Sequence, residues 1–187
     1  MPNGYKTPDK NVSIKVMVRK AQNGSYYVET VKKDDEVVNV RNGVAEVTIA
    51  NKVIPPFGFS IMVHNDETPW INMVGQEFSV KIVNTTTGRV SYSNDRMITN
   101  NAGCLNFPDI YEVGDFEITI EQKTFDASVE DDRTIKTIKI NRDIKNGDIT
   151  VLDITGGNIN VRVENYAYGE VAKVAVASIT NKTVHYI

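Results

Sequence analysis

Apolar and polar residues alternate along most of the chain, with the two-residue period of strands that bury one face. Three segments have the pattern clearly: VSIKVMV at 12 to 18, EFSVKIV at 77 to 83 and DFEITIEQ at 115 to 122. Every second residue in them is apolar, so we expect three strands buried on one side. No window holds a sustained apolar stripe of helical period, since DETPWINMVGQEF contains a proline and a glycine and DASVEDDRTIK lacks the stripe.

Turn signals separate these runs at short intervals. The dipeptide Asn-Gly occurs at 23-24, 42-43 and 146-147, and it suits tight hairpin turns because both central residues need a positive φ. The predicted hairpins join Val12 to Lys20 with Tyr26 to Val31, Val37 to Arg41 with Val44 to Ala50, and Ile135 to Asp143 with Asp148 to Ile154. Short strands at regular spacing predict an all-β protein built from antiparallel β-sandwiches, immunoglobulin-like or prealbumin-like.

Two interruptions divide the chain. NKVIPPFG at 51 to 58 contains consecutive prolines, which cannot continue a hydrogen-bonded ladder, and a softer boundary lies near Ala167 to Gly169. We therefore expect an N-terminal β-sheet region over 1-54, a sandwich over 55-168 and C-terminal strands over 169-187. The C-terminal strands would either complete the N-terminal sheet or pair with a neighbouring subunit, because an unpaired terminal strand is a template for strand addition.

Composition allows a packed core but nominates few partners. The 187 residues are 41% hydrophobic, and 21 Lys and Arg stand against 24 Asp and Glu, for a net charge of -3. This balance gives no reason to expect binding to nucleic acid or to an anionic membrane. No apolar run approaches the roughly 18 to 20 residues that span a bilayer, so no membrane insertion is expected. The start MPNGYKTPDK has no signal-peptide stretch, which favours either a mature form with an added Met1 or a protein that uses no such route.

Residue types that carry chemistry are sparse. A single cysteine, Cys104, excludes an internal disulfide and a cysteine-built metal site, and His64 and His185 are the only histidines. A reactive thiol needs a nearby base, so we expect Cys104 to fill space. The run EDD at 130 to 132 lacks the alternating spacing of calcium loops and predicts a solvated turn. Without a catalytic motif, we expect no enzyme, no catalytic residue, no bound metal and no cofactor.

Aromatic residues leave two interpretations open. Trp70, Tyr92, Tyr111, Tyr166 and Tyr168 could form a platform for sugar, as in carbohydrate-binding β-sandwiches. Ordinary packing in the core and at sheet edges explains the same residues, and the sequence favours that interpretation.

Four stretches follow one another in the second part of the chain: FGFSIMV at 57 to 63, VGQEFSVKIV at 74 to 83, TNNAGCLNF at 99 to 107 and VGDFEITIEQ at 113 to 122. In this order they resemble the prealbumin-like modules of Gram-positive surface proteins, namely the B-type repeats of collagen adhesins and the isopeptide-bond domains of major pilins. The later segments DRTIKTIKINRDIKNGDITV and GGNINVRVENY resemble that family's last hairpin and closing strand, and ASITNKTV at 177 to 184 resembles its Asn-Lys closing. The resemblance spans Pro55 to Tyr166 and implies a prealbumin-like sandwich.

Such modules can form a spontaneous amide crosslink between a lysine on the first strand and an asparagine on the last, assisted by a buried acid that moves protons. The resemblance places Glu121 at the acid position and Asn165 at the acceptor position. The lysine has no match, because Val63 occupies its inward position on FSIMVHN and Lys81 alternates outward from its neighbours. We therefore expect no crosslink, with Glu121 and Asn165 as remnants of the set.

The resemblance implies a non-enzymatic structural or adhesive protein of a bacterial cell surface or pilus. Its partners would be proteins, or further copies of itself, bound through edge or terminal strands. The alternative is a bacteriophage virion protein, a capsid-decoration, fibre or tail component, favoured by the missing lysine and by the absence of signal and sorting segments. A third possibility, a carbohydrate-binding module, requires its aromatic residues to form a planar strip.

Overall fold

The computed structural model describes residues 12-42, 44-49, 54-164 and 173-185, and these residues form strands and no helix. The chain divides into two compact units. The smaller is Tyr5–Lys52, and the larger contains Val53–Ile187. The division falls within the proline-containing stretch NKVIPPFG.

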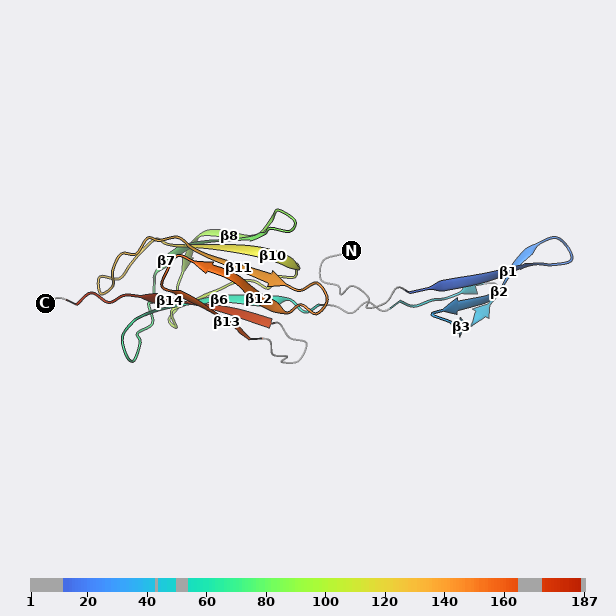
Figure 1. The fold of residues 1–187 in the computed structure, drawn as a ribbon, viewed down its shortest axis with the longest axis horizontal. Helices are drawn as coiled ribbons and strands as arrows, with labels where there is room; N and C mark the ends of the chain where they lie inside the picture. The colour runs from blue at the N-terminus through green and yellow to red at the C-terminus, as the bar shows by residue number, and fades with distance from the viewer. Residues whose placement is uncertain (1–11, 43, 50–53, 165–172, 186–187) are drawn as a thin grey trace. The chain divides into compact units, whose positions relative to one another are not determined.

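The smaller unit is an open antiparallel sheet with a short ribbon. Its sheet has the order β1-β2-β3, from β1 (Ile14–Lys20), β2 (Tyr26–Lys33) and β3 (Glu36–Val38), and its ribbon joins β4 (Val40–Arg41) to β5 (Val44–Ala45) (Figure 1). The first predicted hairpin is confirmed, with Val16 opposite Val31. The second is shorter than expected, because β3 pairs with β2.

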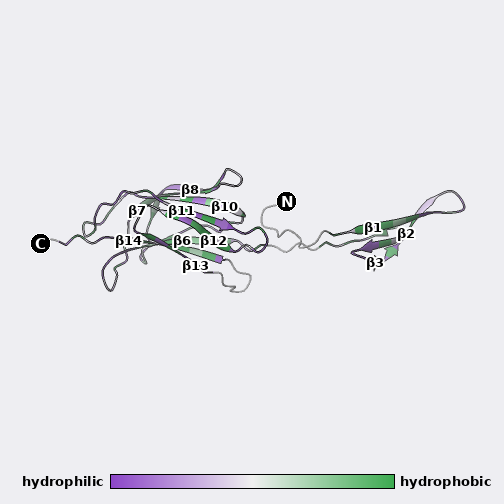
Figure 2. Ribbon diagram, viewed as in Figure 1, coloured by the Kyte–Doolittle hydropathy of each residue, from purple (hydrophilic) through white to green (hydrophobic). Residues whose placement is uncertain are grey.

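The predicted one-sided burial of the first strand is wrong. All seven residues of β1 are exposed, although Figure 2 colours much of this strand as hydrophobic. Among the described apolar residues of the smaller unit, Val31 alone is buried. Three short strands and a two-stranded ribbon do not supply the second layer that an apolar sheet face needs.

The larger unit is a sandwich of two sheets, visible as two layers in Figure 1. One sheet has the order β12 (Ile149–Thr155), β11 (Lys136–Arg142), β10 (Gly114–Gln122), β7 (Glu77–Asn84) and β8 (Arg89–Ile98), all antiparallel. The other has the order β13 (Ile159–Glu164), β14 (Lys173–Asn181), β6 (Phe57–Asn65) and β9 (Cys104–Asn106). The predicted all-β sandwich is thereby confirmed.

Alternation fills the space between the two sheets. The inward sets predicted for β7 and β10 are confirmed and buried: Phe78, Val80, Ile82, Phe116, Ile118 and Ile120. Phe57 of the facing sheet meets Phe116 edge to face, with ring centroids 5.5 Å apart. Because burying each such side chain stabilises the fold by about 1.5–3 kcal/mol, this core carries most of the stability.

The third predicted hairpin, between β11 and β12, is also confirmed. Its turn is longer than a two-residue loop, since Asp143 N–H donates to the Asp148 carbonyl and Gly147 N–H to the Asp143 carbonyl. Gly147 has a φ of 75°, and a Cβ there would lie 2.5 Å from Ile54 Cγ2. Glycine is therefore required twice over, by the backbone conformation and by the close approach of the entering chain.

The expected C-terminal strands need correction. β14 lies inside the second sheet, between β13 and β6, so it neither completes the N-terminal sheet nor leaves the unit. The sandwich therefore extends past residue 168 to Asn181. Small residues explain the placement, because Ala175 and Ala177 let this strand pack closely on the core. The predicted soft boundary, 165-172, lies outside the described residues and connects two strands of one sheet.

Candidate functional site

The first and last strands of the sandwich lie side by side and run parallel. β6 and β14 pair over nine positions, from Phe57 opposite Lys173 to Asn65 opposite Asn181. The chain therefore enters this pair at one end and leaves it at the other. Tension between the two ends acts along the strands, so it loads all of the hydrogen bonds between them together.

A buried arginine fastens the end where the chain enters. Arg142 of β11 is 1% exposed, and its Nη1 donates to the carbonyls of Ile110 at 2.9 Å and Glu112 at 2.8 Å. Its Nη2 donates to the Pro55 carbonyl, and the guanidinium lies 5.3 Å from the centroid of the Phe57 ring. Burial lowers the pKa of Arg142 to about 10, so the side chain remains a cation at neutral pH.

Side chains also fasten the segment that follows β14. Asp66 Oδ1, just after β6, accepts hydrogen bonds from Thr183 N–H at 2.8 Å and Thr183 Oγ1 at 2.6 Å. These bonds from Thr183 hold the pKa of Asp66 below its ordinary value. Lys182 Nζ pairs with Glu130 Oε1 at 2.8 Å, and Glu130 N–H donates to the Lys182 carbonyl. Both ends of the parallel pair are thus tied to the rest of the sandwich.

The residues that the resemblance nominated do not form a buried set. Glu121 lies on the outer face of β10 with its side chain 41% exposed, and its Oε2 pairs with Lys123 Nζ at 2.6 Å. Ile120 takes the inward position instead. Asn165 lies outside the described residues, and β13, which precedes it, is separated from β6 by β14. Val63, at the expected lysine position, is buried opposite Ile179 of β14.

Two buried polar residues were missed by the sequence analysis. Asn181 ends β14 opposite Asn65 and is 3% exposed, and its Nδ2 has no hydrogen-bond partner among the described residues. Lys136 points into the core from β11 at 2% exposure, where its Nζ donates to Asp132 Oδ2 at 3.3 Å and to the Thr134 carbonyl at 3.2 Å. The Asn-Lys closing in ASITNKTV was the available signal for Asn181. A lysine within a run of β-branched residues gave none for Lys136.

The acidic run pairs with cations rather than gathering around a metal. Its ion pairs are Glu130 with Lys182, Asp131 with Arg133 and Asp132 with Lys136. In the part of the chain that the structure describes, no three His, Cys, Asp or Glu side chains gather as a metal site. Cys104 is partly exposed at the start of β9, and its Sγ lies 3.4 Å from the Ala102 carbonyl.

The aromatic residues contact different parts of the sandwich. Trp70 stacks on His64 with ring centroids 4.6 Å apart, whereas Tyr92 meets Phe107 edge to face at 5.3 Å. Tyr111 is exposed beside a different pocket. Tyr166 and Tyr168 lie outside the described residues.

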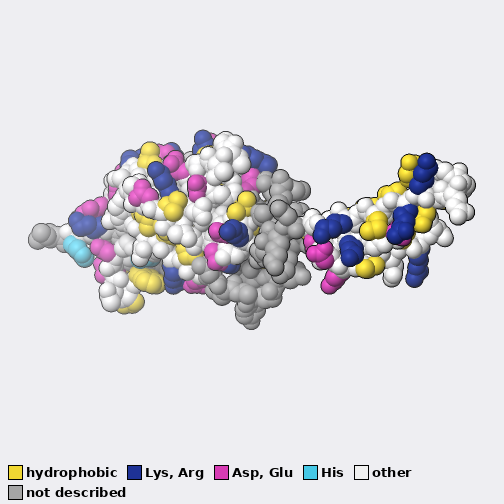
Figure 3. Space-filling view, turned by 45° about the vertical axis from the view of Figure 1, so that its right-hand side comes forward, with side chains coloured by type: hydrophobic (Ala, Val, Ile, Leu, Met, Phe, Trp, Pro, Cys, Tyr) yellow, Lys and Arg dark blue, Asp and Glu magenta, His cyan; other side chains and the backbone are white. Residues whose placement is uncertain are grey.

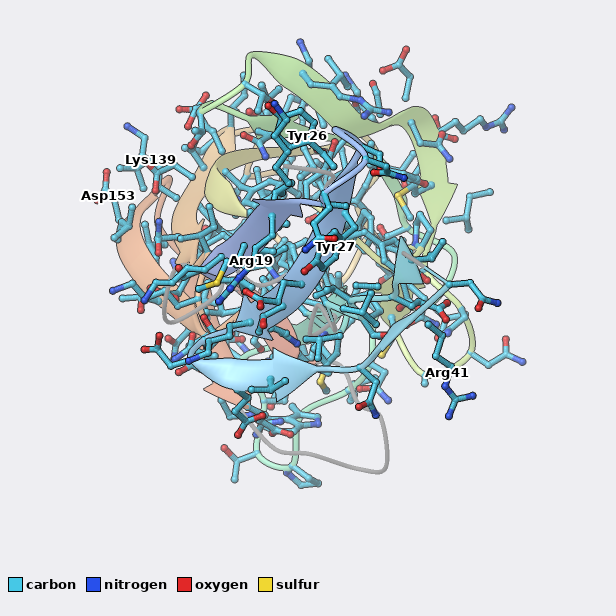
Figure 4. The ribbon with its side chains drawn as sticks, turned by 90° about the vertical axis from the view of Figure 1, so that its right-hand side faces the viewer. Arg19, Tyr26, Tyr27, Arg41, Lys139 and Asp153 are labelled. Atoms are coloured by element: carbon cyan, nitrogen blue, oxygen red, sulfur yellow. The ribbon has the colours of Figure 1, made fainter. Side chains whose placement is uncertain are left out.

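The smaller unit presents its apolar residues to solvent. Ile14, Val16 and Val18 alternate onto one face of β1, and Tyr26 is on the same face, opposite Lys20. Basic side chains interrupt the apolar ones over this unit (Figure 3). On the other face Arg19 Nε pairs with Glu29 Oε2 at 2.6 Å. Figure 4 labels Arg19, Tyr26 and Tyr27 on the two long strands, with Arg41 apart from them on the ribbon.

Comparison with known proteins gives structural likeness alone, since no family model and no curated protein matches the chain. A C-terminal fragment of the pilus adhesin SpaC from Lactobacillus rhamnosus GG is similar to it over 100% of this chain and 74% of the fragment, with a TM-score of 0.53 and 11% identity. Another structure of that fragment gives a TM-score of 0.52 and 9% identity. The open form of SpaC gives 0.50 and 11%, and the chain spans 24% of its length. At these identities the likeness establishes the fold. No described helix is long and apolar enough to cross a membrane.

Proposed function

We propose that the chain is a non-enzymatic structural module of a Gram-positive cell-surface or pilus assembly, and that its sandwich transmits tension between protein partners. The observation that carries the proposal is the parallel pairing of β6 with β14 over nine positions. The likeness to the C-terminal fragment of a pilus adhesin supports the setting. A virion role stays a prediction from the sequence, because the sandwich does not distinguish it.

Shear geometry is the physical basis of this role. When strands peel apart, their hydrogen bonds break one after another, and each break needs little force. When parallel strands are pulled from opposite ends, the bonds must yield together, which raises the barrier to forced unfolding and slows it at a given force. Inward residues of β6, including Phe59 and Ile61, must also leave the core before the strands slide.

Non-covalent contacts carry the tension in this proposal. Val63 replaces the lysine that a crosslink would need, and Glu121 is on the outer face with Lys123. Arg142 and the Asp66–Thr183 contact hold the two ends of the strand pair in place of a covalent bond.

Assembly would use the smaller unit. Its β1 pairs with β2 on one side, and no other described strand pairs with it. An exposed strand edge beside an apolar face accepts an added strand or a second sheet. We therefore place the contact with a protein partner, or with another copy, on β1.

Pulling from two directions tests the mechanical role. In a Cys104→Ser background, one set of molecules is held by the two chain ends and another by the N-terminus and a cysteine at Lys173→Cys. The second attachment peels β14 from β6, because Lys173 lies opposite Phe57 at the same end of the pair. A higher unfolding force for the first set supports the proposal, and equal forces contradict it.

A further inference from the structure

A shallow pocket lies on the outer face of the second sheet, away from the contacts described above. Its volume is about 180 Å³. Neighbouring strands supply its base, since Met62 of β6 lies opposite Ser178 of β14, and Ser178 lies opposite Asn160 of β13. The lining residues are Met62, Trp70, Asn160, Arg162, Val176 and Ser178.

One wall of the pocket is an indole held in a fixed position. Trp70 belongs to the loop that follows β6, and Asn65 closes the base of this loop. Asn65 N–H donates to the Ile71 carbonyl at 3.0 Å, and Asn65 Oδ1 accepts from Ile71 N–H at 2.6 Å. His64 supports one face of the indole, with 26° between the two rings, while Trp70 remains 59% exposed. The aromatic wall is therefore preformed and open to a ligand.

The imidazole beneath Trp70 orients a hydroxyl in the pocket. His64 Nδ1 lies 2.7 Å from the Asn65 carbonyl, which can only accept, so Nδ1 carries the hydrogen. In the neutral ring Nε2 then accepts from Ser178 Oγ at 2.8 Å. With its hydrogen directed to His64, the Ser178 hydroxyl offers a lone pair to a ligand.

Hydrogen-bond donors stand on the strand at the rim. Asn160 Oδ1 accepts from Val161 N–H at 2.8 Å, so its Nδ2 is the group available to a ligand. Arg162 Nε pairs with Glu164 Oε1 at 2.8 Å, and the guanidinium has two further nitrogens. The pocket thus combines an apolar base, an aromatic wall, an acceptor at Ser178 and donors at Asn160 and Arg162.

We propose that this pocket binds one pyranose ring of a glycan. The apolar C–H face of a pyranose packs against an indole, and its neighbouring hydroxyls each donate and accept, as Ser178 and Asn160 require. A pocket of about 180 Å³ is smaller than the roughly 300–1,000 Å³ that drug-sized ligands occupy, so it matches one ring rather than an oligosaccharide. The site lies on the face of the sheet, which favours a sugar over a peptide strand added at an edge. This binding function is independent of the mechanical role.

Trp70 is the chain's one tryptophan, so its indole N–H gives a single reporter resonance in an NMR titration of the full chain. The probes are methyl pyranosides of glucose, galactose, mannose and N-acetylglucosamine, with glucuronic acid as an acidic sugar. At least one should shift the indole and the Ser178 amide resonances saturably, with an affinity near 1 mM, as one buried ring provides. No saturable shift from any of them overturns the proposal. A saturable response of these resonances to a proline-rich peptide, with none to the sugars, also overturns it.

Variants separate binding from folding. Trp70→Ala, followed through the Ser178 amide, and Asn160→Ala should each weaken binding about tenfold, corresponding to one lost stacking or hydrogen-bonding contact. Tyr111→Ala removes an exposed aromatic residue beside a different pocket and should leave binding unchanged. If Trp70→Ala does not fold, Asn160→Ala alone decides the matter. Unchanged affinity in a folded Asn160→Ala protein contradicts the proposed site.

Discussion

Arg142 is a buried cation whose partners are backbone carbonyls rather than a carboxylate. Its Nη atoms bond to the carbonyls of Pro55, Ile110 and Glu112, and its Nε has no partner among the described residues. Burying a charge in this way costs free energy, as the lowered pKa reflects, but the bonds bring three separate segments together at the entrance to β6.

Removing this side chain should destabilise the sandwich strongly. Arg142→Met keeps much of the apolar volume and leaves three carbonyls without their donor, so we expect a loss of about 3 kcal/mol or more in the free energy of unfolding. Denaturant titration measures it. The control is Arg96→Met, since exposed Arg96 pairs only with Glu77, at 3.0 Å, and should change stability by about 0–1 kcal/mol. Equal effects of the two variants would contradict this role for Arg142.

Acid should destabilise the protein below about pH 4. Hydrogen bonds hold the pKa of several carboxyls below the ordinary value of 3.8: Asp66, Asp126, Asp132 and Asp143. The unfolded chain therefore binds protons at a higher pH than the folded one, so this stabilisation is present above pH 3.8 and is lost as the pH falls through the folded values. Thermal unfolding between pH 2 and 7 measures the loss. Asp66→Asn should flatten the acid limb of the curve, and an unchanged slope would show that Asp66 contributes little.

At the scale of residues, the sequence predicted which side chains face the core of β7 and β10 but misassigned the acid. Glu121 was matched through the resemblance, although the inward set Phe116, Ile118 and Ile120 already placed it on the opposite face. A shift of one residue reverses the face of a strand. Arg142 and Lys136 could not be recognised from sequence, because their burial depends on carbonyls and carboxylates brought in by the fold.

At the scale of elements, local pairings were predictable and distant ones were not. Asn-Gly turns identified the β1–β2 and β11–β12 hairpins, whose strands are close in sequence. The partner of β14 is β6, more than a hundred residues earlier, and no turn signal marks a parallel pairing. That distance explains why the C-terminal strand was assigned to the wrong sheet.

The exposed strand β1 should govern self-association. Val16→Glu with Val18→Glu replaces two side chains that are already exposed, so folding stability should change by less than about 0.5 kcal/mol per site. Sedimentation equilibrium should nevertheless show weaker association than for the unaltered chain, because charge opposes packing on an apolar face. Val90→Glu, at an exposed apolar position of β8, is the control and should have no effect. Equal association of all three proteins would exclude β1 as the contact.

At the scale of the whole molecule, the absence of an internal amide crosslink has a direct signature. The intact mass should equal the sequence mass of 20.9 kDa, whereas one lysine–asparagine amide would release ammonia and lower it by about 17 Da. Val63 on β6 and the exposed Glu121 are the reasons for this expectation. A mass lower by 17 Da would contradict it. The first residues to test would then be Lys136 and Asn181, as Lys136→Arg and Asn181→Ala.

The charge of the sandwich is spread rather than concentrated. Acidic, basic and apolar side chains alternate over the face seen in Figure 3, and oppositely charged neighbours such as Lys139 and Asp153 lie side by side on β11 and β12 (Figure 4). Such a surface suits a module whose strength lies in its strand pairing and core.

The most direct measurement is the length released when single full-length molecules are stretched by their two ends. The chain from Phe57 to Asn181 contains about 125 residues, which extend to about 410–450 Å at roughly 3.3–3.6 Å each. We expect the sandwich to open in one high-force event that releases this length, less the distance across the folded unit. Opening at the low force of the peeling attachment would contradict the parallel pair as the element that bears tension. Release of a much shorter length would show that a covalent bond, rather than hydrogen bonds and burial, holds the sandwich closed.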